Sequence, residues 1–312
     1  MRVLITGAQG FVGGKIAQAF CAKGYEVVLG SRVQIDPSSF TNKANSALIN
    51  WSDTSSLEAA CKDVDMVIHA SGMNALDCSI DPLEAFEVNA LHTGKLINAA
   101  ISQKVKRLIY ISTAHVYSNP LLGEISEDTC PKNLHPYATS HLAGENLLLA
   151  NKDIQGIVLR LSNAFGPPVN KSVNCSMLLV NDLCRQAIEE KKILLRSDAS
   201  QLRDFVSMTD VVNVIEHFID LTVQSDQENI FNVGGEFTIS IGQMAEMISS
   251  RAQLLFGYKP RITIIDPKRR YDGENLKYSI EKLKSTGFQM QNLWHAEIDA
   301  TLLFCKEHFG KP

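Results

Sequence analysis

The 312-residue sequence lacks a basic excess, a long apolar run and a basic–apolar leader segment. Its formal net charge is −4, from 30 Lys and Arg against 34 Asp and Glu, which gives no support for binding to nucleic acid or an anionic membrane. No apolar stretch approaches the roughly 18 residues that span a bilayer, and no signal peptide is recognisable. We therefore expect a cytoplasmic protein without a membrane or nucleic-acid partner.

The seven cysteines are scattered, and none of them forms a C-x-x-C pair. An odd number of unpatterned cysteines predicts neither a disulfide framework nor a zinc site, so we predict no metal centre. The 45% hydrophobic and 21% charged residues are ordinary for a globular protein.

The strongest local pattern lies in the first fourteen residues, M-R-V-L-I-T-G-A-Q-G-F-V-G-G. Residues 3–5 predict a short buried strand, and residues 11–20 have helical apolar periodicity. Between them stand Gly7, Gly10 and Gly13. A strand, a glycine turn and a helix N-terminus predict an anion site, because unpaired N–H groups and the positive end of the helix dipole attract a phosphate. A tight turn without a ligand is the alternative.

The glycine spacing differs from the G-x-G-x-x-G dinucleotide fingerprint. It resembles that of the short-chain dehydrogenase/reductase superfamily, and its G-F-V-G ending resembles the extended branch of nucleotide-sugar epimerases, dehydratases and reductases. The resemblance implies an α/β fold, with a doubly wound parallel-sheet Rossmann domain and a smaller α/β C-terminal substrate domain. It also implies that the turn binds a nicotinamide dinucleotide through Gly7, Gln9, Gly10, Phe11, Val12 and Gly13.

The resemblance covers essentially the whole chain and divides it into two domains. The dinucleotide-binding Rossmann domain would comprise residues 1–165 and about 203–235. The substrate-binding lobe would comprise about 166–202 and 236–312.

The residues after the second predicted strand decide whether the cofactor is NAD or NADP. A carboxylate there would accept hydrogen bonds from the ribose 2′-OH of NAD, whereas an Arg would accommodate the 2′-phosphate of NADP. The sequence has Ser31 and Arg32, and no acidic residue before Asp36. Charge and bidentate geometry therefore favour NADP over NAD. An ordinary exposed loop arginine is the alternative.

Three further segments are predicted to line the cofactor. In the extended family an acidic residue at the position of Asp53 hydrogen-bonds the adenine amino group; capping the next helix is an equally weighted alternative. Asn89 stands in a Val-Asn-Ala pattern that the family shares, and a structural polar bridge is its favoured role. Small residues at the end of the fourth predicted strand would let a cofactor lie against the backbone: Ala70, Ser71 and Gly72.

The chemical signature is a hydroxyl residue followed by a tyrosine. Thr113 ends a strand predicted at residues 107–112, and Tyr137 stands in H-P-Y-A-T-S-H. The extended family carries Ser-[Ser/Thr]-x-x-Val-Tyr and then Tyr-x-x-x-Lys. By this resemblance Tyr137 would be the acid/base that moves a proton while hydride passes to or from nicotinamide, and Thr113 would bind the same substrate oxygen. A helix from Pro136 would place Tyr137 and His141 on one face.

Position 141 departs from the family, because His141 replaces the Lys. In the family that Lys grips the nicotinamide ribose, and its charge lowers the tyrosine pKa, which is otherwise about 10. With a reference pKa of about 6.5, a histidine is expected to be partly charged at pH 7. Three interpretations stay open. His141 performs the Lys role, more slowly or at a lower pH optimum; another group, such as His115, assists Tyr137; or turnover has been lost.

Four residues are predicted to contact the substrate. The segment R-L-S-N-A-F-G-P-P resembles a family segment whose Asn touches the diphosphate or sugar, here Asn163, although a turn-stabilising role is the alternative. The segment R-D-F-V-S-M-T-D matches a family signature whose Arg, here Arg203, reaches the diphosphate. His115 follows the catalytic strand, and Arg270 lies in a K-R-R cluster for which a solvated loop is the alternative.

The resemblance implies an NAD(P)-dependent oxidoreductase or epimerase that acts on a nucleotide-diphosphate sugar, at C4. A 4,6-dehydratase is less favoured, because Ala114 and His115 stand where those enzymes usually have Asp-Glu. Ser31-Arg32 favours an NADPH-dependent 4-ketosugar reductase, whereas the S-T-A-x-V-Y segment slightly favours a 4-epimerase that retains NAD. The alternative from another class is a non-catalytic dinucleotide sensor or scaffold, which only the change at position 141 supports.

The family also implies a homodimer. Long helices are predicted at residues 82–103 and 136–151, and relatives pair through such helices.

Overall fold

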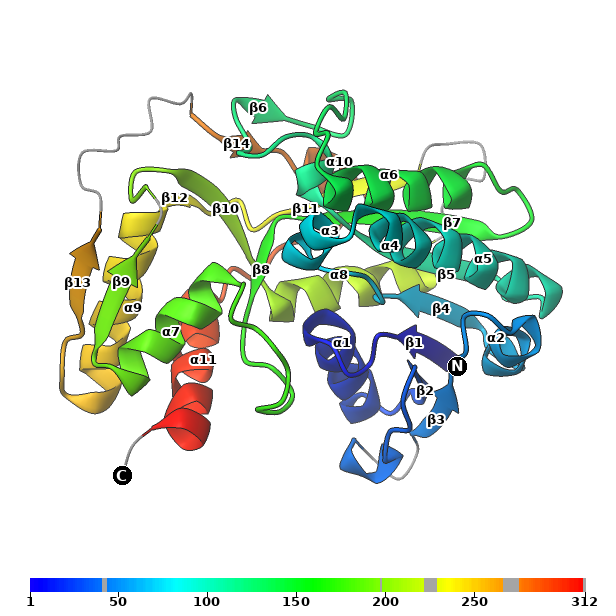
Figure 1. Ribbon diagram of the computed structural model, residues 1–312, viewed down its shortest axis with the longest axis horizontal. Helices are drawn as coiled ribbons and strands as arrows, with labels where there is room; N and C mark the ends of the chain where they lie inside the picture. The colour runs from blue at the N-terminus through cyan, green and yellow to red at the C-terminus, as the bar shows by residue number, and fades with distance from the viewer. Residues whose placement is uncertain (41–43, 197, 222–228, 266–274, 311–312) are drawn as a thin grey trace. The chain divides into compact units, whose positions relative to one another are not determined.

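The computed structural model describes residues 1–40, 44–196, 198–221, 229–265 and 275–310. Its largest sheet has seven strands in the order β11-β7-β5-β4-β1-β2-β3 (Figure 1). β1 pairs in parallel with both β2 and β4, so the order reverses there, and the predicted doubly wound Rossmann fold is confirmed. The strands are β1 (Arg2–Thr6), β2 (Glu26–Ser31), β3 (Asn45–Leu48), β4 (Met66–His69), β5 (Arg107–Thr113), β7 (Gln155–Leu161) and β11 (Ile230–Val233).

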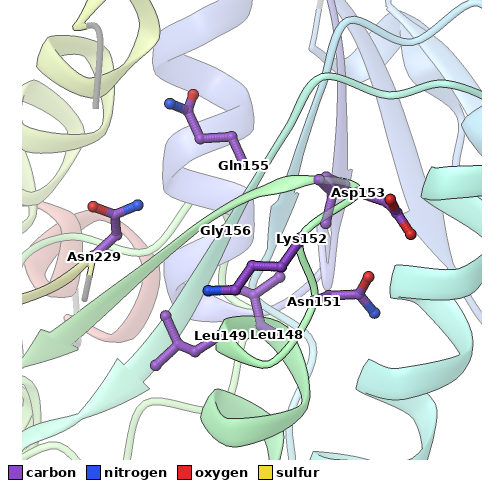
Figure 2. Close-up of a pocket in the computed structure, with 9 residues that line it drawn as sticks. Leu148, Leu149, Asn151, Lys152, Asp153, Gln155, Gly156 and Asn229 are labelled. Carbon is purple, nitrogen blue, oxygen red and sulfur yellow. The ribbon is translucent and has the colours of Figure 1, made fainter. Parts of the chain in front are cut away.

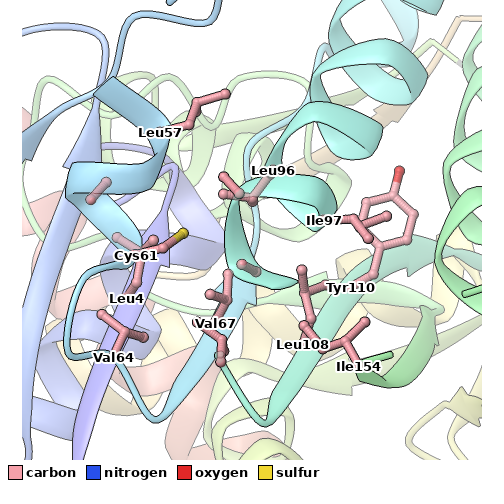
Figure 3. Packing of buried hydrophobic residues seen from close by; sticks show 14 of the residues in the cluster. Leu4, Leu57, Cys61, Val64, Val67, Leu96, Ile97, Leu108, Tyr110 and Ile154 are labelled. Atoms are coloured by element: carbon pink, nitrogen blue, oxygen red, sulfur yellow. The ribbon is translucent and has the colours of Figure 1, made fainter. Parts of the chain in front are cut away.

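Helices pack on this sheet because its strands are apolar on both faces. Leu4, Val67 and Leu108 belong to one buried cluster with side chains of α2, α5 and α6 (Figure 3). Val3 and Ile5 point to the opposite face, since side chains alternate along a strand. The helices are α1 (Phe11–Ala22), α2 (Thr54–Cys61), α3 (Ala75–Ile80), α4 (Pro82–Phe86), α5 (His92–Ser102), α6 (Pro136–Leu149) and α8 (Met208–Asp220).

The long helix predicted at residues 82–103 contains a π-helical segment, η2 (Glu87–Leu91), between α4 and α5. Pro82 occupies the first helical position, and the Asp81 side chain caps it by accepting from the Glu84 backbone N–H. Asn89 lies in the π-helical segment, and such segments are frequent at functional sites.

The remaining elements form small sheets with the orders β12-β10-β8, β13-β9 and β14-β6. A separate apolar cluster joins α7, α9 and α11 around Leu183, Ile248 and Leu302. The strands are β6 (Glu124–Ile125), β8 (Asn163–Phe165), β9 (Lys192–Leu195), β10 (Leu202–Ser207), β12 (Thr238–Ser240), β13 (Arg261–Ile264) and β14 (Lys277–Tyr278). The helices are α7 (Leu179–Glu189), α9 (Ile241–Phe256), α10 (Glu281–Ser285) and α11 (Trp294–Phe309).

The chain divides into two compact units. The first contains Met1–Asn119, Cys130–Arg160 and Ile215–Phe231, and the second contains Pro120–Thr129, Leu161–Val214 and Asn232–Pro312. Four segments fall in the second unit although the sequence analysis assigned them to the Rossmann domain: 120–129, 161–165, 203–214 and 232–235. The functional boundaries stay a prediction. Within the described ranges, no helix combines the length and apolarity needed to cross a bilayer.

Candidate functional site

The turn between β1 and α1 requires glycine at two positions. Gly7 has a φ of +70°, and a Cβ atom there would lie 2.7 Å from the Ala70 carbonyl oxygen. A Cβ atom at Gly13 would lie 2.4 Å from the Gly7 carbonyl oxygen. Side chains are therefore excluded, and the backbone of the turn stays open to close approach by a ligand.

The N-terminus of α1 has the properties of an anion site. Gly10 is the N-cap and offers no side-chain hydrogen bond, and the first turn contains no acidic residue. The first-turn N–H groups, which belong to Phe11, Val12 and Gly13, have no partner within the helix. Together with the helix dipole they fit the diphosphate of a dinucleotide.

The end of β2 carries the residues predicted to distinguish NAD from NADP. The Ser31 hydroxyl donates to Gln9 Oε1 at 3.2 Å and accepts from the Val33 backbone N–H at 3.2 Å. Arg32 is exposed, and no carboxylate among the described residues forms an ion pair with it. Its guanidinium is therefore available to an anionic group of a ligand.

Asp53 is the N-cap of α2. Its Oδ1 accepts a hydrogen bond of 3.0 Å from the Ser55 backbone N–H. The capping role, one of the two predicted alternatives, is confirmed, and the adenine contact stays a prediction.

The end of β4 is held by buried polar contacts. The Ser71 backbone N–H donates to Thr6 Oγ1 at 3.3 Å. The fully buried Asn89 accepts from the Met73 backbone N–H at 2.8 Å and donates to Ser140 Oγ at 3.0 Å. Asn89 is therefore the structural bridge that the sequence analysis favoured, between the loop after β4 and α6.

Thr113 ends β5 and turns the chain into a short 3₁₀ segment, η3 (Ala114–Val116). Its Oγ1 accepts from the His115 backbone N–H at 3.1 Å, and Asn133 Nδ2 donates to the His115 carbonyl at 2.7 Å. His115 thus lies two residues after the catalytic candidate Thr113, and its contact with a substrate stays a prediction.

Tyr137 and His141 lie one turn apart near the start of α6, as the i, i+4 spacing predicts. His135 caps this helix, because its Nδ1 accepts from the Tyr137 backbone N–H at 3.1 Å. The Tyr137 and His141 rings meet edge to face with centroids 4.6 Å apart. Burial raises the pKa of the Tyr137 hydroxyl, and a hydrogen bond with the Thr113 side chain opposes that rise. Thr113, Tyr137 and His141 are thus brought together.

His141 is 6% exposed, and burial lowers its pKa to about 4. Its imidazole is therefore neutral at pH 7, and the expectation of partial charge is wrong. Its Nδ1 lies 2.9 Å from the Tyr110 hydroxyl. A Cβ atom at Gly72 would lie 3.7 Å from His141 Nε2, so that nitrogen faces the end of β4.

Three buried polar residues beside His141 were missed in the sequence. Tyr110 and His69 stand in the apolar runs of β5 and β4, where they read as core positions, and Thr93 stands in a helix. Their exposures are all 0%. A polar residue inside an apolar strand was the only available signal, because a buried polar group needs a partner.

The second unit holds two of the predicted substrate residues. Asn163 Nδ2 donates to the Asp204 carbonyl at 2.8 Å, which ties β8 to β10 and supports the structural alternative. Arg203 is half-buried, desolvation lowers its pKa, and no carboxylate among the described residues pairs with it. Arg270 lies outside the described residues.

A cavity of about 230 Å³ lies elsewhere, where α6 ends and β7 begins (Figure 2). The candidate catalytic residues follow the opposite, carboxyl ends of the strands, so this cavity is separate from them. Its lining residues are Leu148, Leu149, Asn151, Lys152, Asp153, Ile154, Gln155, Gly156 and Asn229.

Comparison with known proteins agrees with this geometry. A dTDP-D-glucose 4,6-dehydratase of Mus musculus is 25% identical over 332 residues, covering 99% of this chain and 89% of the relative. The solved structure of MoeE5 in complex with UDP-glucuronic acid and NAD superposes with a TM-score of 0.82 at 22% identity, over 98% of this chain and 99% of that one. The solved structure of UDP-glucuronic acid 4-epimerase from Bacillus cereus, in complex with UDP-glucuronic acid and NAD, superposes with a TM-score of 0.80 at 24% identity. The match covers 98% of this chain and 99% of that one.

The family model that matches is that of the NAD dependent epimerase/dehydratase family, over residues 3–234. This match spans the glycine turn, the end of β4 and the Thr113, Tyr137 and His141 cluster. The chain belongs to the NAD dependent epimerase/dehydratase family.

Proposed function

We propose that the protein is an NAD(P)-dependent oxidoreductase or epimerase that acts at C4 of a nucleotide-diphosphate sugar. The observation that carries the proposal is that Tyr137 lies beside His141, with ring centroids 4.6 Å apart, and close to the Thr113 side chain. Two hydroxyl groups at the carboxyl end of β5 suit one substrate oxygen: Thr113 orients it and Tyr137 exchanges its proton.

The glycine turn supports binding of a nicotinamide dinucleotide. The uncapped N-terminus of α1 attracts its diphosphate, and Ala70, Ser71 and Gly72 leave room beside the backbone. Bound there, the cofactor supplies a hydride acceptor or donor. Arg32 favours NADP, whereas the two solved neighbours named above hold NAD.

A nucleotide-diphosphate sugar is the proposed substrate because Arg203 is a desolvated guanidinium without a carboxylate among the described residues. A half-buried guanidinium without a carboxylate partner among the described residues is a suitable contact for a phosphate group. Asn163, His115 and Arg270 are proposed as further substrate contacts. The two solved neighbours are complexes with UDP-glucuronic acid, which belongs to this class of substrate.

The choice among reactions rests on Ala114 and His115. Neither residue supplies the acid and base pair that eliminates water, so 4,6-dehydration is not the proposed reaction, although one relative is named a dehydratase. Reversible oxidation at C4 needs only one acid/base, Tyr137. Epimerisation and 4-ketosugar reduction both fit that requirement.

We also propose a homodimer through the helical segments 82–103, which contain α4, η2 and α5, and 136–151, which contain α6. Large apolar side chains are exposed on neighbouring helices of the first unit, Leu83 at 84% and Ile80 at 74%. Such a cluster is characteristic of an interaction surface. The exposed residues are Leu76, Ile80, Leu83, Phe86, Leu91 and Leu147. Light scattering at micromolar concentration should give a dimer mass, and Leu83→Asp should give a monomer; a monomeric wild-type protein would contradict this proposal.

The decisive experiment is to incubate the protein with UDP-glucose, UDP-glucuronic acid or dTDP-glucose and NAD, and with the 4-keto derivatives and NADPH. Nuclear magnetic resonance of the sugar should detect inversion or reduction at C4, and Tyr137→Phe should lose it. Binding of dinucleotide and sugar without turnover would instead support the non-catalytic alternative. Binding of neither would overturn the proposal.

A further inference from the structure

Behind His141 lies a continuous set of buried hydrogen bonds within the first unit. Thr6 Oγ1 lies 2.7 Å from His69 Nδ1, and His69 Nε2 lies 2.9 Å from Thr93 Oγ1. Thr93 Oγ1 donates to the Asn89 carbonyl at 2.8 Å, and the Tyr110 hydroxyl lies 3.2 Å from the same oxygen. His141 Nδ1, at 2.9 Å from the Tyr110 hydroxyl, ends the set.

The donor and acceptor in each of these hydrogen bonds follow from the Asn89 backbone carbonyl, which can only accept. Its contacts with the Thr93 and Tyr110 hydroxyls are therefore both hydrogen bonds only when both hydroxyls direct their protons to it. With its only proton used in this way, the Tyr110 oxygen acts as the acceptor toward His141. In this arrangement His141 Nδ1 carries the proton of its hydrogen bond to the Tyr110 hydroxyl.

The same accounting of donors and acceptors determines the tautomer of His69. Because Thr93 gives its proton to Asn89, its oxygen accepts from His69, and His69 carries its proton on Nε2. His69 Nδ1 then accepts from the Thr6 hydroxyl, whose oxygen also accepts from the Ser71 backbone N–H. The two buried histidines thus have opposite tautomers in the arrangement that satisfies every contact.

We propose that Tyr110 is a positioning residue that holds His141 as the Nδ1–H tautomer, so that its unprotonated Nε2 faces Gly72 as a hydrogen-bond acceptor for a ligand hydroxyl. The ring stacking of Tyr110 on His141, with centroids 5.9 Å apart and planes 29° apart, fixes the orientation of the imidazole. His141 is neutral at pH 7, since burial lowers its pKa to about 4, so its tautomer sets its hydrogen-bonding character.

In this tautomer His141 contacts a ligand hydroxyl with donor and acceptor exchanged relative to a lysine. A lysine ammonium has three donors and no acceptor, whereas Nε2 of this tautomer only accepts. A hydroxyl that meets His141 must therefore point its proton toward the protein, which is the opposite of what a lysine demands. That this hydroxyl belongs to the ribose of a dinucleotide rests on the proposed function; the tautomer itself does not.

The experiment is nuclear magnetic resonance of protein labelled with ¹⁵N-histidine, in which couplings from the ring protons distinguish protonated from unprotonated ring nitrogens. His141→Gln assigns the His141 signals, and His69 serves as the internal contrast. At pH 7 the wild-type protein should show His141 protonated on Nδ1 and His69 protonated on Nε2. His141 protonated on Nε2 would overturn the proposal.

Tyr110→Phe removes the acceptor and should convert His141 wholly or partly to the Nε2–H tautomer. Tyr117→Phe is the matched control, because it removes another buried phenol hydroxyl, one that bonds Arg160 Nη1 at 2.8 Å. It should leave the His141 signals unchanged. An unchanged tautomer in Tyr110→Phe, or an equal change in both variants, would overturn the proposal.

A binding measurement separates this inference from the proposed function. Tyr110→Phe should weaken NADH binding roughly threefold to tenfold, the effect of one hydrogen bond. If the wild-type tautomers are as proposed but no dinucleotide binds, the proposed function fails and the role of Tyr110 stands. If NADH binds equally well to Tyr110→Phe despite a changed tautomer, the acceptor contact at Nε2 is refuted.

Discussion

Glu145 and Arg160 form an ion pair almost sealed from solvent, with Arg160 Nη2 at 2.6 Å from Glu145 Oε2 and exposures of 0% and 3%. Arg160 also donates to the Tyr117 hydroxyl at 2.8 Å, and the Ser112 hydroxyl donates to Glu145. The pair joins α6, which carries Tyr137 and His141, to β7. The pair therefore supports the helix that carries the candidate catalytic residues Tyr137 and His141.

Arg160→Leu should therefore destabilise the protein. It leaves the Glu145 carboxylate buried without its partner, which costs roughly 3–5 kcal/mol of unfolding free energy. Urea unfolding followed by circular dichroism measures the loss. Lys277→Met, which breaks the exposed pair with Glu124, is the control and should change stability little. Equal losses in both variants would show that burial of the Glu145 pair is not the cause.

The buried state of His141 predicts how stability depends on pH. Its pKa is about 4 in the folded protein against about 6.5 in an unfolded chain, so between these values only the unfolded chain binds the proton. The contribution of neutral His141 to the free energy of unfolding is therefore fully present above pH 6.5. It decreases by on the order of 3 kcal/mol as the pH drops to 4. His141→Gln should make the curve of unfolding free energy less steep between pH 4 and 6.5, while His69, whose pKa burial lowers to about 3, keeps its own share of the slope. Parallel curves for the two proteins would refute a buried neutral His141.

The sequence was sufficient for those features that depend on local spacing. Gly7 and Gly13 predicted the tight turn, and the i, i+4 spacing of Tyr137 and His141 predicted their shared helix face; both are found. The doubly wound fold was implied by the family resemblance that these local motifs carry. Each of these depends on residues close together in the chain.

Properties that depend on distant residues were not predictable. The charge of His141 is set by burial against Tyr110, which is 31 positions away and stands in an apolar strand. The direction of its hydrogen bond depends on Asn89, in a helix whose π-helical segment leaves no clear mark in the sequence. A reference pKa therefore misled the prediction, because no local pattern reveals the dielectric environment of a side chain.

Gly13→Ala tests the glycine turn. Its Cβ atom would lie 2.4 Å from the Gly7 carbonyl oxygen, so the turn must shift, and binding of NADH and NADPH should fall at least tenfold by calorimetry, roughly the value of one charge-assisted hydrogen bond. Gly24→Ala is the control: Gly24 has a φ of +86° and no atom near the added methyl group. It should lower stability by about 1 kcal/mol and leave binding unchanged. Normal binding by Gly13→Ala would remove the turn from the cofactor site.

Arg32→Ala tests the preference for NADP. The exposed Arg32 guanidinium would bind the 2′-phosphate, so the ratio of NADH to NADPH dissociation constants should fall roughly tenfold to a hundredfold. The affinity for NADH should hardly change. Fluorescence titration with both cofactors measures the ratio. Tight NADH binding by the wild-type protein, with no effect of the variant, would instead indicate an NAD-dependent epimerase.

His141→Lys tests whether a positive charge beside Tyr137 governs the pH profile. Burial raises the pKa of Tyr137, and the neutral His141 offers no charge to lower it, so oxidation at C4, in which the Tyr137 phenolate accepts the proton, should rise with pH through the neutral range. A lysine ammonium in contact with the phenol should move this rise roughly one to three units toward acid. The measurement is kcat against pH at saturating cofactor and sugar nucleotide, because the lysine also changes the contact with the ribose. His141→Gln, which adds no charge, should leave the profile in place. If the lysine variant keeps the wild-type profile, Tyr137 is not the group whose ionisation limits turnover.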